Sequence, residues 1–155
     1  MGSFKVKILI AVFAAILLHI VSCTPESCLE GTIAYFKAPL YRTSDEKNIA
    51  PDSLTLYGLN MEADKIYDKA KGIKLALMPL NPSADSCGFV MTINDVTDTI
   101  LIWYASFPHL ISQECGYTFF HTLDSLIVTY HAIDSVIIRN RFVTTINEEN
   151  IRILY

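Results

Sequence analysis

The sequence predicts an all-β domain, an antiparallel two-sheet sandwich of about seven to nine strands, behind a cleaved export signal. Short runs of β-branched and aromatic residues alternate with turn-forming residues at fairly even spacing, which is typical of an all-β fold. Two runs are apolar on both faces, as expected of strands inside a sandwich. Strand count favours an immunoglobulin-like sandwich over a small closed barrel.

The first 22 residues have the layout of a signal peptide. Lys5 and Lys7 precede an apolar run from Ile8 to Val21. This run is shorter than the roughly 20 apolar residues that a membrane-spanning helix needs. We therefore expect residues 1–22 to be a leader, and the remaining chain to be one domain.

Ile20-Val21-Ser22-Cys23 places an aliphatic residue, a small residue and a cysteine at the predicted cut. This arrangement resembles the lipobox of bacterial lipoproteins, which implies that Cys23 is lipidated. Residues 23–31 would then be a lipidated tether, residues 32–155 a single β domain, and acyl chains the link to the membrane. The alternatives are an ordinary secretory signal and an uncleaved anchor.

Charge argues against nucleic-acid partners. The whole chain has a formal net charge of −4. Without residues 1–22, the chain has ten basic and sixteen acidic residues, so its formal net charge is −6. Such a domain is repelled by phosphate backbones and is not attracted to anionic lipid head groups.

Nine runs are predicted strands, and the breaks between them hold turn-forming residues. The predicted strands are Thr32–Lys37, Leu54–Leu59, Ile73–Met78, Cys87–Ile93, Thr99–Ala105, Tyr117–His121, Ser125–His131, Val136–Val143 and Ile151–Leu154. The clearest hairpin loop is Asn94–Asp98. The one competing helical signal lies in Asn60–Lys71, where Asn60 is a candidate cap, and a single short helix there would not change the all-β class. In Thr99–Ala105 both faces are apolar, so that strand belongs in the middle of a sheet.

If Cys23 carries lipid, Cys28, Cys87 and Cys115 remain, and three thiols cannot all pair. Chain entropy gives about 4.6 kcal/mol for a Cys28–Cys115 bridge and about 3.6 kcal/mol for Cys87–Cys115, which does not separate them. We favour Cys28–Cys115 because Cys28 lies just before the first strand. Three reduced, buried cysteines are the alternative.

The polar residues match no catalytic or metal-binding motif. His109, His121 and His131 with Ser112, Ser125 and Asp124 form no recognisable Ser-His-Asp pattern, and His121 and His131 are expected at solvated strand ends. Zinc is not expected, because the isolated cysteines and histidines lack a close array of ligands. The acidic residues Asp95, Asp98, Glu148 and Glu149 are expected in solvated turns rather than in a calcium site. No cofactor is predicted.

Aromatic residues are densest in one region, and strand alternation displays at least one of them. An exposed apolar patch would mark a contact surface. The candidate contact residues are Trp103, Tyr104, Phe107, Phe119 and Phe120.

Four segments, in their order and spacing, resemble an uncharacterised family of small Bacteroidetes envelope lipoproteins. They are Leu54–Leu59, Leu77–Pro82, Asp98–Tyr104 and Glu114–Tyr117. The resemblance implies a lipid-anchored β domain of unknown function. It also implies conserved positions for Cys28 and Cys115 but not for Cys87.

We therefore expect a non-enzymatic binding or scaffolding module, tethered to the outer membrane by lipid and facing the periplasm, with another envelope protein as its partner. The alternatives are a small periplasmic hydrolase using His109 or His121, and a small outer-membrane barrel. The barrel is disfavoured because it needs polar lumen-facing positions that these strands lack.

Overall fold

A computed structural model describes residue 28 and residues 31–155 of the chain. The predicted leader, Cys23 and most of the predicted tether lie outside the described residues. The described part contains strands and no helix. The strands are β1 (Tyr35–Tyr41), β2 (Leu54–Gly58), β3 (Lys65–Ala70), β4 (Leu75–Pro79), β5 (Ser86–Ile93), β6 (Val96–Ser112), β7 (Gly116–Val128), β8 (Ser135–Ile138), β9 (Phe142–Val143) and β10 (Ile151–Leu154).

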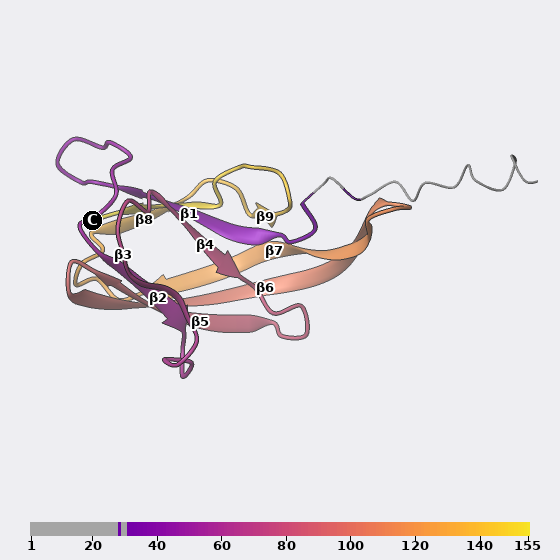
Figure 1. The fold of residues 1–155 in the computed structure, drawn as a ribbon, viewed down its shortest axis with the longest axis horizontal. Coiled ribbons are helices and arrows are strands. Elements are labelled where there is room, and N and C mark those ends of the chain that lie inside the picture. Colours follow the sequence, from indigo (N-terminus) through magenta and orange to yellow (C-terminus); the bar gives the residue numbers. More distant parts are fainter. Residues whose placement is uncertain (1–27, 29–30) are drawn as a thin grey trace, which may run out of the picture.

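The strands form two stacked sheets, so the predicted sandwich is confirmed (Figure 1). One sheet has four strands in the order β4-β1-β10-β8, and the other has six in the order β3-β2-β5-β6-β7-β9. All pairs are antiparallel except β1 with β10, which run parallel. The first and last strands therefore lie side by side in the middle of the smaller sheet.

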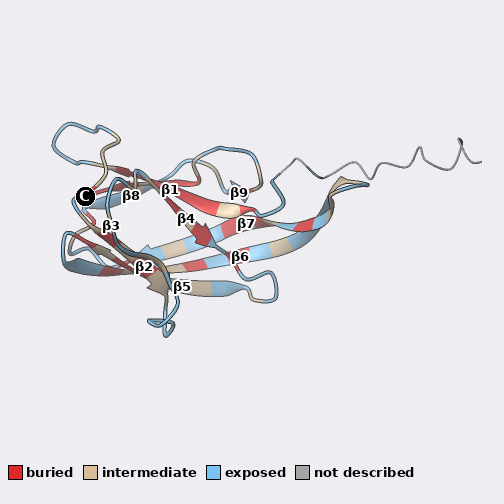
Figure 2. Ribbon diagram, in the orientation of Figure 1, coloured by how far each residue is buried: buried red, intermediate tan, exposed pale blue. Residues whose placement is uncertain are grey.

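Alternation along each strand builds the core between the sheets. In β1, Phe36, Ala38 and Leu40 are fully buried, and Ile100 and Ile102 of β6 face them from the other sheet. Figure 2 shows these buried positions along the facing strands. Burying a side chain of this size contributes roughly 1.5–3 kcal/mol. The facing apolar rows therefore hold the two sheets together.

The hairpin between β5 and β6 turns at Asn94 and Asp95, as predicted, and the loop is only these two residues long. Both have positive φ, 48° and 68°. A two-residue type I′ turn needs positive φ at both positions, and Asn and Asp tolerate this conformation well. Asn94 Oδ1 also accepts a hydrogen bond from Ser53 N (3.2 Å).

The competing helical signal in Asn60–Lys71 does not give a helix. Asn60 adopts φ 64° in a turn, and Lys65–Ala70 then form β3 along the edge of β2. Tyr67 Oη accepts a hydrogen bond from Leu77 N at 3.2 Å, which ties β3 to the other sheet. Backbone pairing with β2 and this contact outweigh a weak local helix signal.

The segments predicted as Thr99–Ala105, Tyr117–His121 and Ser125–His131 belong to two much longer strands, β6 and β7. The gap predicted between the last two segments is a shift in register next to Asp124, where Trp103 pairs with Ser125 and Tyr104 with Leu123. A bulge of this kind lets a strand continue through polar residues. The predicted strand Val136–Val143 is conversely split into β8 and β9.

Among the described strands, β6 beyond Tyr104 pairs only with β7, and β7 before His121 pairs only with β6. Residues 105–120 therefore form a two-stranded extension, here called the ribbon, which projects past the sandwich (Figure 1). Gly116 closes its three-residue turn with φ 72°. At this turn Cys115 forms a disulfide with Cys28, with the Cα atoms 4.9 Å apart.

The predicted Cys28–Cys115 pairing is thus confirmed, and Cys87 is a free thiol, as expected. Within residues 31–155 and residue 28, no helix has the length and apolar character to cross a membrane.

Candidate functional site

The five aromatic residues predicted to form one contact surface lie in three different settings. Trp103 is 36% exposed on the outer face of the six-stranded sheet. Phe107, Phe119 and Phe120 lie on the ribbon. Tyr104 is 1% exposed, so its assignment to a displayed surface is wrong. It follows Ile100 and Ile102 on the inner face of β6.

Tyr104 is held in the core by two hydrogen bonds. Its hydroxyl donates to Asn81 O (2.9 Å) and accepts from Asn81 N (3.1 Å). Burial raises the pKa of Tyr104 to about 12. Tyr104 therefore ties the 81–85 loop to the six-stranded sheet and offers nothing to a ligand.

The first apolar surface is the sheet patch, defined as Leu59, Leu101, Trp103 and Ile127. Leu101 and Ile127 are cross-strand partners on the outer face, and Gly88 is the next residue in that row. A Cβ at Gly88 would lie 3.0 Å from both Leu59 Cβ and Leu101 Cδ2. Gly88 therefore lets these two side chains close over the strand. Leu59 and Ile127 remain 42% and 60% exposed.

The second apolar surface is the ribbon. Phe107 and Phe120 form an edge-to-face pair with ring centroids 6.3 Å apart, and His109 stacks on Phe120 at 4.1 Å. Leu110, Tyr117 and Phe119 remain exposed. Thr118 Oγ1 donates a hydrogen bond to Thr32 O (2.6 Å), which fixes the ribbon to the segment before β1.

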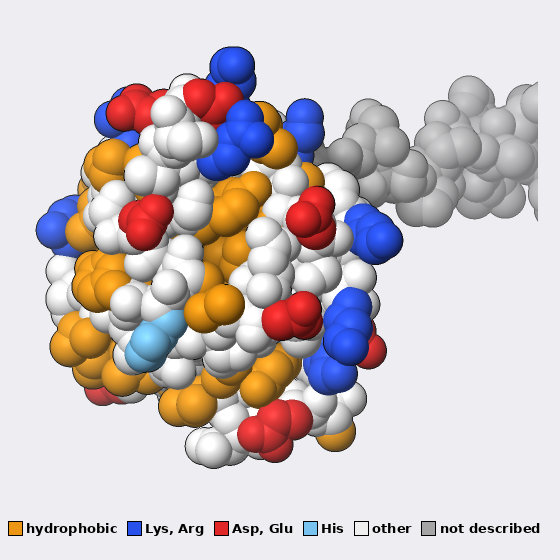
Figure 3. Space-filling model, turned by 90° about the vertical axis from the view of Figure 1, so that its left-hand side faces the viewer, with side chains coloured by type: hydrophobic (Ala, Val, Ile, Leu, Met, Phe, Trp, Pro, Cys, Tyr) orange, Lys and Arg blue, Asp and Glu red, His pale blue; other side chains and the backbone are white. Residues whose placement is uncertain are grey.

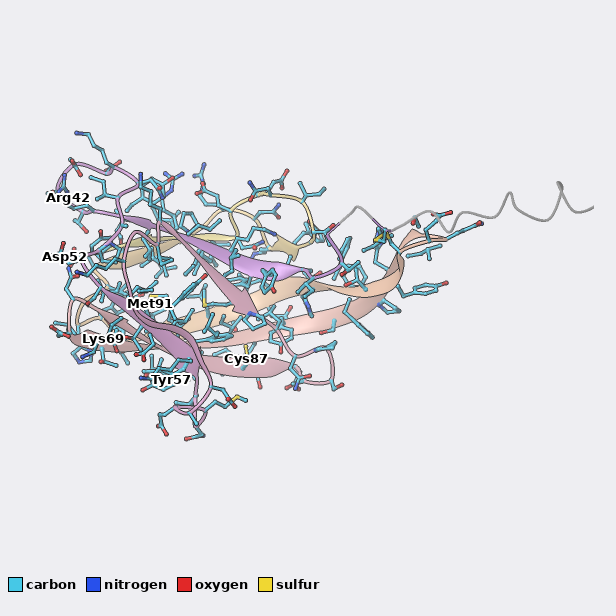
Figure 4. All side chains as sticks on the ribbon, in the orientation of Figure 1. Arg42, Asp52, Tyr57, Lys69, Cys87 and Met91 are labelled. Carbon is cyan, nitrogen blue, oxygen red and sulfur yellow. A yellow bond between two sulfur atoms is a disulfide. The ribbon has the colours of Figure 1, made fainter. Side chains whose placement is uncertain are left out.

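A groove of about 480 Å³ opens beside the sheet patch. It is bordered by apolar side chains of the β2–β3 turn, of β3, of the end of β4 and of β5. The apolar lining residues are Leu59, Met61, Ile66, Pro79, Leu80 and Phe89. Cys87 also lines it, and burial raises the pKa of this thiol to about 11. A thiol that stays protonated at neutral pH is a poor nucleophile. Figure 4 shows Cys87 between the sheets.

His121 is buried, which corrects its expected place at a solvated strand end. Its ring lies edge-on to Tyr104 at 5.4 Å, and its Nδ1 is 2.8 Å from Ser106 Oγ. Burial lowers the pKa of His121, so the neutral ring is favoured. Among the described residues no carboxylate hydrogen-bonds to this ring.

The Ser106–His121 pair was not predicted from the sequence. The two residues are 15 positions apart and meet only through the register of β6 and β7. None of the hydrogen bonds among the described residues joins a histidine to Ser112, Ser125 or Asp124, the groups considered for a triad. Ser112 Oγ instead accepts from Cys115 N (3.0 Å) at the ribbon turn.

Asp98 is the most heavily hydrogen-bonded acidic residue of the described chain, and its expected place in a solvated turn is wrong. Its carboxylate is buried and accepts five hydrogen bonds of 2.7–2.9 Å. The donors are Thr129 Oγ1, His131 N and Nδ1, Ala132 N and Ile133 N. The sequence spacing indicates the burial of Asp98, because Asp98 lies two and four residues before Ile100 and Ile102 and so points to the same inner face of β6.

The other acidic residues considered for a calcium site lie apart. Glu149 pairs with Arg152 (2.6 Å), and Glu148 accepts from Asn140 Nδ2 (2.7 Å). In the described part of the chain, no three His, Cys, Asp or Glu side chains gather closely enough to hold a metal ion.

Comparison with known proteins assigns the chain to a family by its sequence. No curated protein and no solved structure gave a significant match. A protein-family model, described as a family of unknown function (DUF6452), matches residues 53–155, from the residue before β2 to the end of β10. Because this match covers about two thirds of the sequence, the chain belongs to the DUF6452 family.

Proposed function

We propose that this chain is a lipid-anchored protein of the cell envelope that acts as a non-enzymatic binding module, held in the outer membrane and facing the periplasm. The leader with Lys5 and Lys7, its short apolar run and the Ser22-Cys23 junction support the anchor. The likeness of four segments to small Bacteroidetes envelope lipoproteins supports the setting.

The sheet patch is the observation that carries the binding role. Trp103 and Ile127 are 36% and 60% exposed on the outer face of the six-stranded sheet, and Leu59 of the same patch also lines the apolar groove. Exposed apolar patches mark interaction sites, and tryptophan is enriched among residues that dominate binding energy. A second envelope protein that buries this patch is the partner we propose.

The contacts of the reactive side chains favour binding over catalysis. His109 stacks on Phe120, His131 donates to Asp98, and His121 packs against Tyr104. Each of these interactions supports the fold. Catalysis would instead require a base positioned beside a nucleophile and oriented by a third group.

The alternative of a small periplasmic hydrolase has one supporting observation, the 2.8 Å contact between Ser106 Oγ and His121 Nδ1. In a working Ser-His-Asp set the Nδ1 atom faces the carboxylate instead. Labelling with a serine-directed fluorophosphonate tests this alternative. We expect Ser106 to stay unmodified under native conditions, and covalent modification that is lost in Ser106→Ala would favour the hydrolase.

Membrane fractionation tests the anchor. The Cys23→Ala chain should leave the membrane fraction or accumulate with its leader uncut, whereas Cys87→Ala should fractionate like wild type. Unchanged membrane association of Cys23→Ala would contradict lipid anchoring.

Cross-linking in intact cells tests the binding surface. Ile127→Ser removes an exposed side chain of the sheet patch, and Ile137→Ser removes a comparable one, 44% exposed, from the outer face of the other sheet. We expect a cross-linked product that is lost with Ile127→Ser and retained with Ile137→Ser. Equal effects of the two substitutions would argue against the sheet patch.

A further inference from the structure

We infer that the ribbon lies in the lipid interface, so that the membrane holds the domain both by its acyl chains and by the ribbon's apolar side chains. This inference rests on the proposed lipid anchor and specifies which end of the molecule faces the bilayer.

The ribbon has the composition of a membrane-contacting element. Phe107, Leu110, Tyr117 and Phe119 are between 40% and 73% exposed. Residues 105–120 contain one charged residue, Glu114 at the turn. A two-stranded hairpin with exposed apolar side chains is marginally stable and prone to associate unless something covers it. Aromatic side chains, tyrosine above all, are favoured where apolar and aqueous phases meet.

The disulfide brings the anchor to this end of the molecule. Cys115 at the ribbon turn is bonded to Cys28, and only residues 24–27 separate Cys28 from the proposed lipidated Cys23. Five extended steps span at most about 18 Å. The ribbon is itself about 27 Å long, at roughly 3.4 Å per residue over residues 105–112. The distance from the lipid on Cys23 to the ribbon turn is therefore shorter than the ribbon itself.

The opposite end of the sandwich has a different surface. Figure 3 views that end, where acidic and basic side chains are spread among hydrophobic ones. Arg42, Asp45 and Lys47 form ion pairs there, and Figure 4 places Arg42, Asp52 and Lys69 at the same end. Charged groups are expensive to bring into a lipid interface. The single charged residue of the ribbon, against several ion-paired ones at the opposite end, supports an orientation in which the ribbon end faces the bilayer.

The contact we infer is apolar and not electrostatic. With its net negative charge the domain is not attracted to anionic head groups. Phenylalanine, leucine and tyrosine side chains would enter the boundary between head groups and acyl chains, to a depth of roughly 5–10 Å. Binding of the ribbon should therefore not depend on salt.

Trp103 is the only tryptophan of the chain, which makes fluorescence a direct test. In a Trp103→Phe background, Tyr117→Trp places an indole near the ribbon turn. Tyr130→Trp places one just after β7, at the far end of the same strand, where the native tyrosine is 61% exposed. Both full-length chains, made with their leader and extracted in mild detergent, are reconstituted into phosphatidylcholine vesicles with and without brominated acyl chains.

We expect the Tyr117→Trp chain to show blue-shifted emission and quenching by bromine at low and at high salt, and the Tyr130→Trp chain to show neither. If the vesicles carry the protein on flotation but Tyr117→Trp is not quenched, the ribbon inference is wrong and the anchor stands. Equal quenching of both chains would also overturn it.

Two further outcomes are distinguishable. A blue shift without quenching, together with cross-linking of two chains through the ribbon, would show that a second copy covers the ribbon and would overturn the inference. Absence of flotation and of any acyl mass on the chain would instead overturn the proposed anchor.

Discussion

Asp98 is the residue on which the far end of the sandwich depends. Its buried carboxylate collects backbone N–H groups of residues 131–133, which follow β7 and lead to β8. Burial alone would raise the pKa of Asp98. Hydrogen bonds from Thr129, Ile133, Ala132 and His131 outweigh that effect and hold the pKa at about 2. A single ionised side chain thus organises a loop that has few other backbone partners.

Asp98→Asn should lower the free energy of unfolding by about 3 kcal/mol, because the amide nitrogen cannot accept the hydrogen bonds that one carboxylate oxygen accepts. Asp95→Asn is the matched control three residues away, in an exposed turn that asparagine tolerates, and should change stability by about 0.5 kcal/mol or less. Urea unfolding at pH 7 measures both. Similar midpoints for the two variants would contradict the role given to Asp98.

Acid should weaken the fold through the same residue. A carboxylate whose pKa is lower in the folded than in the unfolded state stabilises the fold above the unfolded pKa of about 4, and this contribution is lost as pH falls toward about 2. Between pH 5 and pH 2 the wild type should lose about 2 kcal/mol more than Asp98→Asn. Parallel pH profiles from urea unfolding would show that Asp98 titrates normally.

At the scale of elements, the ribbon is the feature least supported by the rest of the fold. Within the described residues no strand lies beside it on either edge, and it is held by the Cys28–Cys115 bridge and by the hydrogen bond of Thr118. Local opening should therefore begin there, since regions with few buried contacts open at lower free energy than the core.

Replacing Cys28 and Cys115 together by serine should speed hydrogen exchange in residues 105–120 and leave the amides of β1 and β10 protected. Cys87→Ser, which removes the free thiol, should leave ribbon exchange unchanged. Mass spectrometry of exchanged peptides distinguishes these regions. Loss of protection throughout the core would mean that the bridge supports the whole sandwich and not the ribbon.

The positions of several strands and turns were predictable from local sequence patterns alone. β10 has the bounds predicted for it, β5 begins one residue earlier than predicted, and the Asn94-Asp95 turn is where turn chemistry places it. In these segments the local preference and the final partners agree. The same holds for the cysteine pairing, where Cys28 precedes the first strand.

Other features depend on partners distant in sequence. β3 is a strand because β2 offers an edge, and β7 continues past Asp124 because β6 runs beside it. The Ser106–His121 contact and the burial of His121 follow from that register as well. Asp98 differs from these cases, because its even spacing from Ile100 indicates the inner face of β6, and the expectation of a solvated turn did not use that spacing.

At the scale of the whole molecule, the fold unites distant parts of the chain. The family match begins at Ser53, yet β1 lies between β4 and β10 in the middle of the smaller sheet. The folded unit therefore includes residues before the matched region. The disulfide joins the chain before β1 to the ribbon turn, so the ribbon and the start of the described domain lie at one end of the molecule.

The proposed anchor and the membrane orientation both depend on a lipid at Cys23. Trypsin digestion of the membrane-extracted, reduced protein should release one N-terminal peptide from Cys23 to Lys37, because residues 24–36 contain no lysine or arginine. Mass spectrometry should find this peptide beginning at Cys23 and carrying the added mass of acyl chains. A peptide that begins at any other residue, or that begins at Cys23 without acyl mass, would contradict the anchor and with it the membrane orientation.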